Sequence, residues 1–126
     1  MRRLAAAALL AWLPAVAAAQ TAAPAPPPPA WLPRPSANLV LLNKITARPR
    51  SVSVAVGQSV AFGSLTIVVR ACDVRPPDVA ADATAFLDIT DSHPDVPAFH
   101  GWMLTNEPEV SMLEHPLYDV RVAGCG

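Results

Sequence analysis

Apolar residues alternate with small or polar residues in several short segments of this sequence, and this two-residue period limits the fold more than any other feature. In residues 51–56, Val52, Val54 and Val56 occupy every second position, which places them on one face of an extended strand. The same period in residues 65–72 predicts a second one-sided set, formed by Leu65, Ile67, Val69 and Ala71. Helical spacing is nearly absent, so the sequence predicts an all-β fold.

Val60 and Phe62 also alternate, before Gly63, which indicates a bulge or a second turn. Further strand candidates are bounded by proline, glycine or acidic turn residues, and they cover residues 41–48, 85–90, 99–105 and 118–123. Residues 109–114 are expected to form a single helical turn. Together these segments predict a small antiparallel β-sandwich or open barrel of six to seven short strands.

The N-terminal residues have the pattern of a secretory signal peptide. Arg2 and Arg3 precede an apolar stretch, and three alanines at positions 17–19 supply the small residues that a signal peptidase accepts. Pro14 interrupts the stretch, which is shorter than the roughly 20 residues of a membrane-spanning helix. We therefore expect cleavage of residues 1–19, no transmembrane segment in the remaining chain, and a periplasmic or extracellular location.

The chain has two cysteines, Cys72 and Cys125, each near the end of a predicted strand. Disulfides persist in the oxidising compartments to which exported proteins travel, so we predict that these two residues form one disulfide. A redox-active pair is the alternative, but such pairs usually lie close together in sequence, as in a C-x-x-C arrangement. A structural bridge between Cys72 and Cys125 would close a loop of about fifty residues, and the chain-entropy model predicts that it stabilises the domain by roughly 4 kcal/mol.

Residues 20–37 are rich in alanine and proline, a composition that favours extended polyproline II structure and cannot form a core. This stretch is predicted to be a disordered tether, and residues 38–126 are predicted to form the β domain. Trp31 is a large apolar side chain within the proline-rich stretch. We interpret it either as part of a docking surface or as a residue that packs on its own domain.

The charge of the chain argues against nucleic acid as a partner. The formal net charge is −1 at pH 7, and two of the nine basic residues, Arg2 and Arg3, belong to the predicted leader. The remaining chain has no cluster of lysine and arginine, whereas binding to a phosphate backbone requires one.

The three histidines, at positions 93, 100 and 115, form no array with the spacing of a metal site, so we expect neither a metal nor a cofactor. His115 is the strongest candidate for chemistry, because Asp119 follows closely, which allows a carboxylate to hold its imidazole. Ser111, four residues before His115, would share a helical face with it if the segment is helical. No nucleophile-elbow glycines surround Ser111, so no catalytic residue is assigned. The alternative for His115 is a turn histidine that bonds to the backbone.

Residues 99–103 carry large groups on both faces of a predicted strand. Trp102 falls on one face and Met103 on the other, and a sheet with two apolar faces must cover one of them with another element or a partner. A core role for both residues is one interpretation. The other is a partner surface formed by Trp102 and Met103, together with Trp31 on the tether, since tryptophan and methionine are enriched in binding interfaces.

Five sequence segments, taken in order, resemble a known family of exported bacterial proteins, the domain of unknown function 2155. They are residues 42–48 (LNKITAR), 62–72 (FGSLTI continuing to RAC), 75–77 (RPP), 101–103 (GWM) and 113–120 (LEHPLYDV), followed by Cys125. The resemblance implies an envelope protein with a paired cysteine, and it transfers no catalytic residue.

We therefore expect a non-enzymatic interaction or accessory module of the bacterial envelope, with an envelope protein as its partner. One alternative is a small envelope hydrolase that uses the region of His115. Another is a periplasmic module that binds a small ligand or a metal. The sequence leaves the identity of the partner and the oligomeric state open.

Overall fold

A computed structural model describes residues 8–17 and 30–126. The strands are β1 (Leu32–Pro33), β2 (Ser36–Asn43), β3 (Arg48–Ala55), β4 (Ser59–Phe62), β5 (Leu65–Val74), β6 (Ala83–Asp91), β7 (Phe99–Leu104) and β8 (Tyr118–Cys125), and η1 (Pro108–Val110) is a short 3-10 helix. The predicted all-β fold with one disulfide is confirmed. The described residues contain eight strands where the sequence predicted six to seven, because β1 was not expected.

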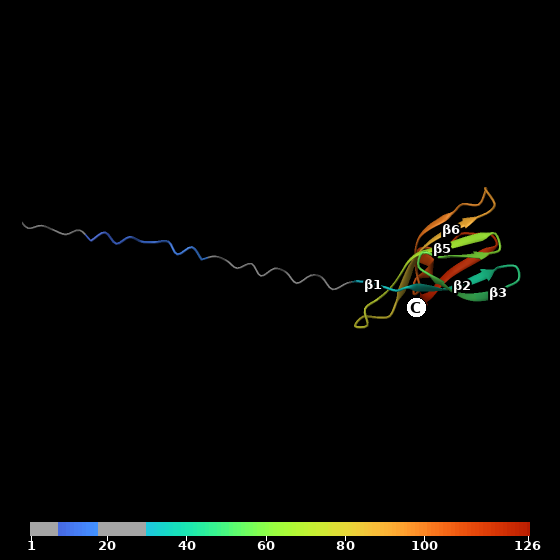
Figure 1. The fold of residues 1–126 in the computed structure, drawn as a ribbon, viewed down its shortest axis with the longest axis horizontal. Coiled ribbons are helices and arrows are strands. Elements are labelled where there is room, and N and C mark those ends of the chain that lie inside the picture. Colours follow the sequence, from blue (N-terminus) through green and yellow to red (C-terminus); the bar gives the residue numbers. More distant parts are fainter. Residues whose placement is uncertain (1–7, 18–29) are drawn as a thin grey trace, which may run out of the picture.

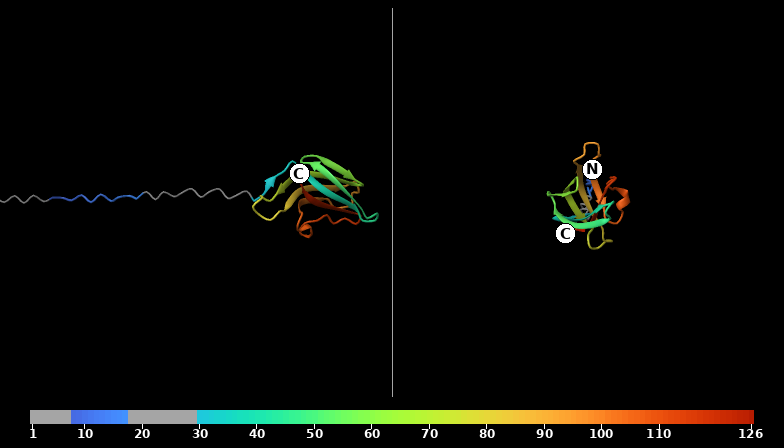
Figure 2. Two further views of the ribbon diagram at one scale, coloured as in Figure 1. Left: turned by 90° about the horizontal axis from the view of Figure 1, so that it is seen from below. Right: turned by 90° about the vertical axis from the view of Figure 1, so that its right-hand side faces the viewer.

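The strands form two antiparallel sheets packed face to face (Figures 1 and 2). The larger sheet has the order β1-β5-β6-β7, and β4 also pairs with β5. The smaller sheet has the order β3-β2-β8. Across the interior, β2 contacts β5 and β6 contacts β8. The arrangement is a sandwich and not a closed barrel.

Side chains from both sheets fill the space between them. The largest fully buried residues are Leu39, Leu41, Leu65, Ile67, Val69, Cys72, Leu87, Ile89 and Val120. All of them belong to β2, β5, β6 or β8, the strands that face one another across the interior. Burial of this apolar surface, at about 25 cal/mol per Å², is the main term that stabilises the domain.

The prediction of one continuous strand over residues 41–48 was wrong, because a turn divides this segment between β2 and β3. The side-chain Oδ1 of Asn43 accepts hydrogen bonds from the backbone N–H groups of Ile45 and Thr46, at 2.9 and 3.3 Å. Ala47 adopts a positive φ of 54°. An asparagine that bonds to the backbone two residues ahead reverses the chain direction, so the two strands form a hairpin.

A β-bulge in β5 changes which residues face the core, so the predicted inward face is only partly correct. Leu65, Ile67 and Val69 are buried as expected, but the register between β5 and β6 shifts between Val69 and Ala71. The extra residue reverses the alternation, so Cys72 lies in the core with 1% of its surface exposed, while Ala71 is only half-buried. The bulge therefore directs the cysteine toward the opposite sheet.

In β3, the predicted inward face holds for only part of its length. Val54 is buried and Val52 is half-buried, whereas Val56 lies beyond the end of the strand and is 38% exposed.

The folded domain begins before residue 38, the boundary that composition predicts. β1 and the first two residues of β2 lie within the stretch expected to be tether, and Ala37 has no exposed surface. The reason is conformational: proline keeps itself and the residue before it extended, and an edge strand tolerates proline. Residues 20–29 of the predicted tether lie outside the described residues.

Of the predicted signal peptide, residues 8–17 are described. They form no helix or strand and are exposed. In the described parts of the chain, no helix has the length and apolarity needed to cross a membrane.

Candidate functional site

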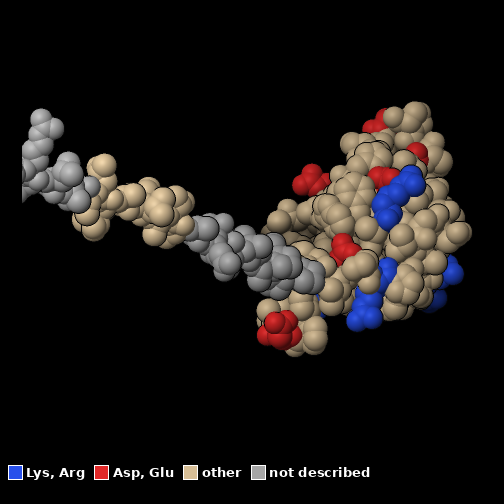
Figure 3. Space-filling view, turned by 60° about the vertical axis from the view of Figure 1, so that its left-hand side comes forward, with Lys and Arg blue, Asp and Glu red and all other residues tan. Residues whose placement is uncertain are grey.

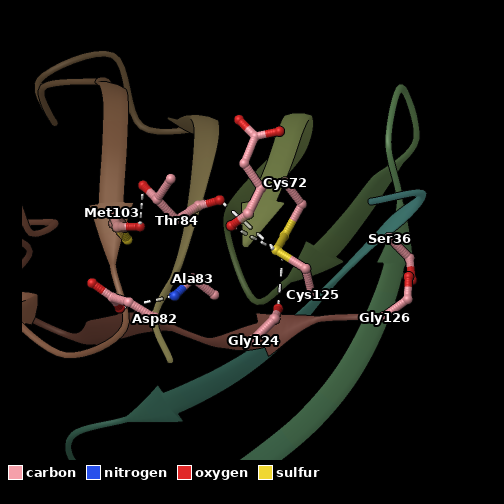
Figure 4. The surroundings of a disulfide bond; sticks show 10 residues. Ser36, Cys72, Asp82, Ala83, Thr84, Met103, Gly124, Cys125 and Gly126 are labelled. Carbon is pink, nitrogen blue, oxygen red and sulfur yellow. Dashed lines mark hydrogen bonds between the residues drawn. A yellow bond between two sulfur atoms is a disulfide. The ribbon is translucent and has the colours of Figure 1, made fainter. Parts of the chain in front are cut away.

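A disulfide joins the two sheets at the end of the domain where β1 enters. Cys72 lies on β5 of the larger sheet and Cys125 ends β8 of the smaller sheet, with 5.8 Å between their Cα atoms. Figure 4 shows the bridge beside Thr84 and Gly124. The predicted pairing is confirmed, and the bridge fixes one sheet to the other.

At the opposite end of the domain, four residues form a polar group that we call the Asp91 cluster: Ser64, Asp91, His93 and His115. Asp91 ends β6, and its Oδ2 accepts hydrogen bonds from Ser64 Oγ and from His115 Nε2, both at 2.8 Å. Its Oδ1 accepts from the backbone N–H of His93 at 2.8 Å and from His93 Nδ1 at 2.7 Å. The carboxylate side chain is 1% exposed, so its charge is shielded from water by these donors.

These donors lower the pKa of Asp91 well below its usual value. The backbone N–H of His93 contributes most, and the side chains of His115 and Ser64 act in the same direction, while burial opposes them. Hydrogen bonds to a carboxylate favour its charged form. Asp91 is therefore a stable anion around which this end of the domain is ordered.

The hydrogen bonds of His115 assign its tautomer. Nδ1 accepts from the backbone N–H groups of Leu117 and Tyr118, at 3.0 and 3.1 Å, so the proton is on Nε2, which donates to Asp91. The side chain is 4% exposed, and its ring lies 5.0 Å from that of Tyr118. Both ring nitrogens are engaged, which is the arrangement of a turn histidine and leaves neither free for proton transfer with a substrate.

The structure does not bring the three residues considered for chemistry into one hydrogen-bonded group. Among the described residues, Ser111 has no hydrogen bond to His115 or Asp119, and Asp119 Oδ2 accepts from Arg121 Nε at 3.0 Å. Ser111 and Asp119 border a common cavity, but its volume is about 10 Å³. That is room for about one water molecule and not for a substrate.

The other two histidines lie on the surface. The side chain of His93 is 67% exposed and that of His100 is 57% exposed. His100 Nδ1 and Arg70 Nε both bond to Asp88, at 2.7 and 2.6 Å, and the Arg70 contact is the first cause of a lowered Asp88 pKa. No group of three histidine, cysteine or acidic residues that could hold a metal ion occurs in the described parts of the chain.

A groove on the outer face of the larger sheet brings together two of the three residues predicted as a partner surface. Its walls are Trp31, Asp73, Thr84, Trp102 and Leu104, and its volume is about 330 Å³. We call it the tryptophan groove. It lies at the disulfide end of the domain, since Asp73 is the residue after Cys72.

The two tryptophans are held in different ways. Trp102 is 44% exposed, and its ring packs edge-on against Phe86 with 5.4 Å between ring centroids. Trp31 is half-buried, and the guanidinium of Arg75 lies 4.0 Å from its ring centroid. Met103 is 3% exposed and faces the core, so it does not line the groove.

Sequence analysis missed Phe86 and Leu104 at the groove, and Asp91 and Ser64 in the cluster. Their roles follow from the register of neighbouring strands, in which Phe86 is opposite Trp102 and Thr84 is opposite Leu104. No signal within one strand gives that register. Asp91 lies 24 residues from His115 in the sequence, so the pair is visible only in the fold.

Charged side chains are dispersed on the one face of the molecule that Figure 3 shows. On the face shown in Figure 3, acidic and basic residues occur in small separate groups among uncharged ones. Charge therefore does not single out a ligand surface on this face, and the apolar lining of the tryptophan groove is its more distinctive property.

The fold and these contacts define a small antiparallel β-sandwich domain with a disulfide between its sheets. The chain belongs to the family described as uncharacterized protein conserved in bacteria (DUF2155), whose model matches residues 37–125.

A relative from Rickettsia prowazekii (strain Madrid E), described as an uncharacterized protein, is 29% identical over 91 residues. The match covers 69% of this chain and 58% of the relative, so the chain spans little more than half of that protein's length. No solved structure matches the chain.

Proposed function

We propose that this domain is a non-enzymatic interaction module of the bacterial envelope, and that it binds a protein partner through the tryptophan groove. The observation that carries the proposal is the exposed ring of Trp102 facing a groove whose other wall is Trp31. Large exposed aromatic groups on a small domain are costly to leave in water, and they are enriched where proteins bind one another.

The state of His115 supports an interaction role over catalysis. Its two ring nitrogens bond to Asp91 and to the backbone, and the cavity beside Ser111 has a volume of only about 10 Å³. A general base needs a free nitrogen within reach of a bound substrate. The Asp91 cluster is instead a means of holding the end of the sandwich together.

Two features support a location outside the cytoplasm. Residues 1–19 have the pattern of a signal peptide, and the domain contains a disulfide of the kind that persists in oxidising compartments.

Export is tested by fractionating cells that produce the full chain. We expect a periplasmic product that begins at Gln20 and has no alkylatable thiol, and a cytoplasmic product that keeps its first 19 residues would contradict this.

Partner binding is tested by placing a photo-crosslinking amino acid at position 104, which lines the groove beside Trp102, in the full chain and in native envelopes. We expect a discrete crosslinked product. The matched control places the same amino acid at Ile45, which is 81% exposed and lies in the β2–β3 turn at the other end of the domain. Crosslinking from neither position, or equally from both, would contradict a role for the groove.

A further inference from the structure

We propose that the tryptophan groove binds the proline-rich segment of a second copy of this chain, so that two copies exchange residues 21–29. This inference rests on the proposed function, because it names the occupant of the same groove. The first argument is size. A volume of about 330 Å³ is near the lower end for ligand sites, which suits a few residues of an extended peptide and not a folded domain.

The second argument is chemistry. Grooves lined by aromatic residues recognise proline-rich segments in the polyproline II conformation, because such a segment is already extended and loses little entropy on binding. Its backbone carbonyls have no internal partners, and indole N–H groups are donors. Among the described residues, neither Trp31 nor Trp102 has a hydrogen bond from its indole N–H to the protein.

The third argument is the position of such a segment in this sequence. Residues 21–29 read TAAPAPPPP, with prolines at positions 24 and 26–29. The described domain begins at Ala30, whose carbonyl accepts a hydrogen bond from Arg75 at 3.1 Å, and the same arginine covers the ring of Trp31. The proline-rich segment thus joins the domain at the residue next to the groove wall.

The fourth argument concerns the copy that supplies the segment. To enter its own groove, the chain would have to reverse direction between Pro29 and Trp31, directly after four consecutive prolines. Proline fixes φ near −65° and disfavours the helical region for the residue before it, so a run of prolines favours continuation in one direction, and exchange between copies needs no reversal. Nine residues in polyproline II conformation span about 28 Å, enough to reach a neighbouring domain.

Exchange between two copies has a simple symmetry. Each copy contributes one segment and one groove, so a two-fold axis satisfies both sites at once and closes the assembly as a dimer.

We therefore expect a chain of residues 20–126 to sediment as a dimer. Two variants are expected to be monomers: Trp102→Ala, which removes a groove wall, and a variant with serine at positions 26–29, which removes the ligand and lies outside the described domain.

Mixing the two variants provides the decisive test. One has an intact segment and the other an intact groove, so the mixture is expected to form a heterodimer through a single contact. Its dissociation constant should exceed that of the native dimer by about tenfold or more, since aromatic anchors dominate interfaces of this kind. Circular dichroism establishes that both variants are folded, and Ile45→Ala is the control that leaves the dimer intact.

Three results would overturn the inference. They are a monomeric native chain, a dimer that survives both variants, and a synthetic peptide of residues 21–30 that binds the groove while the chain remains monomeric. The last result would assign the groove to a proline-rich segment of another protein. If the chain is monomeric but position 104 still gives a specific crosslink in envelopes, the proposed function stands and only the second copy is excluded. If both experiments fail, the groove is not an interaction site.

Discussion

Asp91 is a single carboxylate that connects three parts of the chain. It belongs to β6, and its partners come from the turn before β5 and from the segment before β8. Because β6 and β8 belong to different sheets, the bond from His115 to Asp91 connects the sheets at the end of the domain far from the disulfide. Sequence reasoning singled out His115 but not Asp91, since nothing local marks the pair.

The lowered pKa of Asp91 predicts a loss of stability in acid. An aspartate whose pKa is lower in the folded state contributes stability that is fully present above the unfolded value of about 3.9. That contribution is lost as the pH falls from this value through the lower folded-state pKa. We expect urea unfolding midpoints to decrease between pH 5 and pH 2, and to decrease less in Asp91→Asn than in the native protein.

The comparison needs a second carboxylate as a control. Asp88 also has a lowered pKa, but its side chain is 20% exposed and its partners are on the surface. Asp88→Asn should therefore change the pH dependence less than Asp91→Asn does. Parallel curves for the native protein and Asp91→Asn would contradict the role that we assign to Asp91.

Gly63 is a second residue whose identity is fixed by its neighbours. It has a φ of 57°, and a Cβ atom placed on it would lie 2.1 Å from the hydroxyl of Tyr118 and 2.5 Å from the adjoining ring carbon. Gly57 also has a positive φ, of 87°, but no atom lies within 4 Å of its Cβ position. A side chain at Gly57 would therefore introduce backbone strain alone, whereas a side chain at Gly63 would add steric overlap with Tyr118.

We expect Gly63→Ala to destabilise the domain by about 2–4 kcal/mol, the sum of left-handed backbone strain and overpacking against a buried ring. Gly57→Ala should cost about 1–2 kcal/mol, from backbone strain alone. Urea unfolding monitored by tryptophan fluorescence measures both changes. If both variants lose the same free energy of unfolding, the side chain of Tyr118 moves away from the new methyl group without destabilising the domain, which would contradict this prediction.

Among the secondary-structure elements, β5 to β8 were predictable because each begins and ends at turn residues. The two-residue period located them within a few residues, and it identified Leu65, Ile67 and Val69 as core positions. It failed at the bulge after Val69, since an inserted residue leaves no local mark. It also failed at residues 41–48, where the turn depends on one asparagine side chain.

At β1, composition gave the wrong expectation. Prolines and alanines predicted a tether up to residue 37, but extended proline-rich backbone also suits an edge strand. The groove was predictable only in part. Trp31 and Trp102 were assigned to one partner surface together with Met103, but Met103 faces the core, and the position of Trp31 beside Trp102 depends on the pairing of β1 with β5, which no local pattern reveals.

The early start of the domain predicts the result of a truncation. A chain that begins at Asn38 lacks β1 and Ala37. It also loses three backbone hydrogen bonds, from Arg34 N–H to the carbonyl of Cys72, from Val56 N–H to that of Pro35 and from Gly126 N–H to that of Ser36, at 2.7, 2.9 and 2.9 Å. At about 1 kcal/mol per hydrogen bond, we expect a loss of about 2–4 kcal/mol relative to a chain that begins at Ala30. Thermal unfolding of the two chains measures the difference, and equal midpoints would restore the boundary that composition indicated.

At the scale of the whole molecule, two connections join the same pair of sheets at opposite ends. One is the covalent bond between Cys72 and Cys125, and the other is the hydrogen bond between His115 and Asp91. A domain of this size buries only a modest fraction of its chain surface, so connections between the layers matter for its stability. The chain-entropy model assigns about 4 kcal/mol to a bridge with this sequence separation.

Removing the bridge should therefore cost about 4 kcal/mol. The variant is Cys72→Ala with Cys125→Ala, compared in urea with the native protein in its oxidised form and after reduction. Reduction of the native protein should give a similar loss. If the variant and the oxidised protein unfold at the same urea concentration, the bridge does not support the sandwich.

Cys72 immediately precedes Asp73, which lines the groove and pairs with β1, the strand that begins one residue after Trp31. The disulfide that joins the two sheets therefore also supports the part of β5 against which β1 and Trp31 are placed. A copy whose sulfurs are still reduced lacks this bond, so we expect it to hold the wall of the groove less firmly. If the groove binds a partner as proposed, a reduced copy should bind it more weakly, and formation of the disulfide would come before binding.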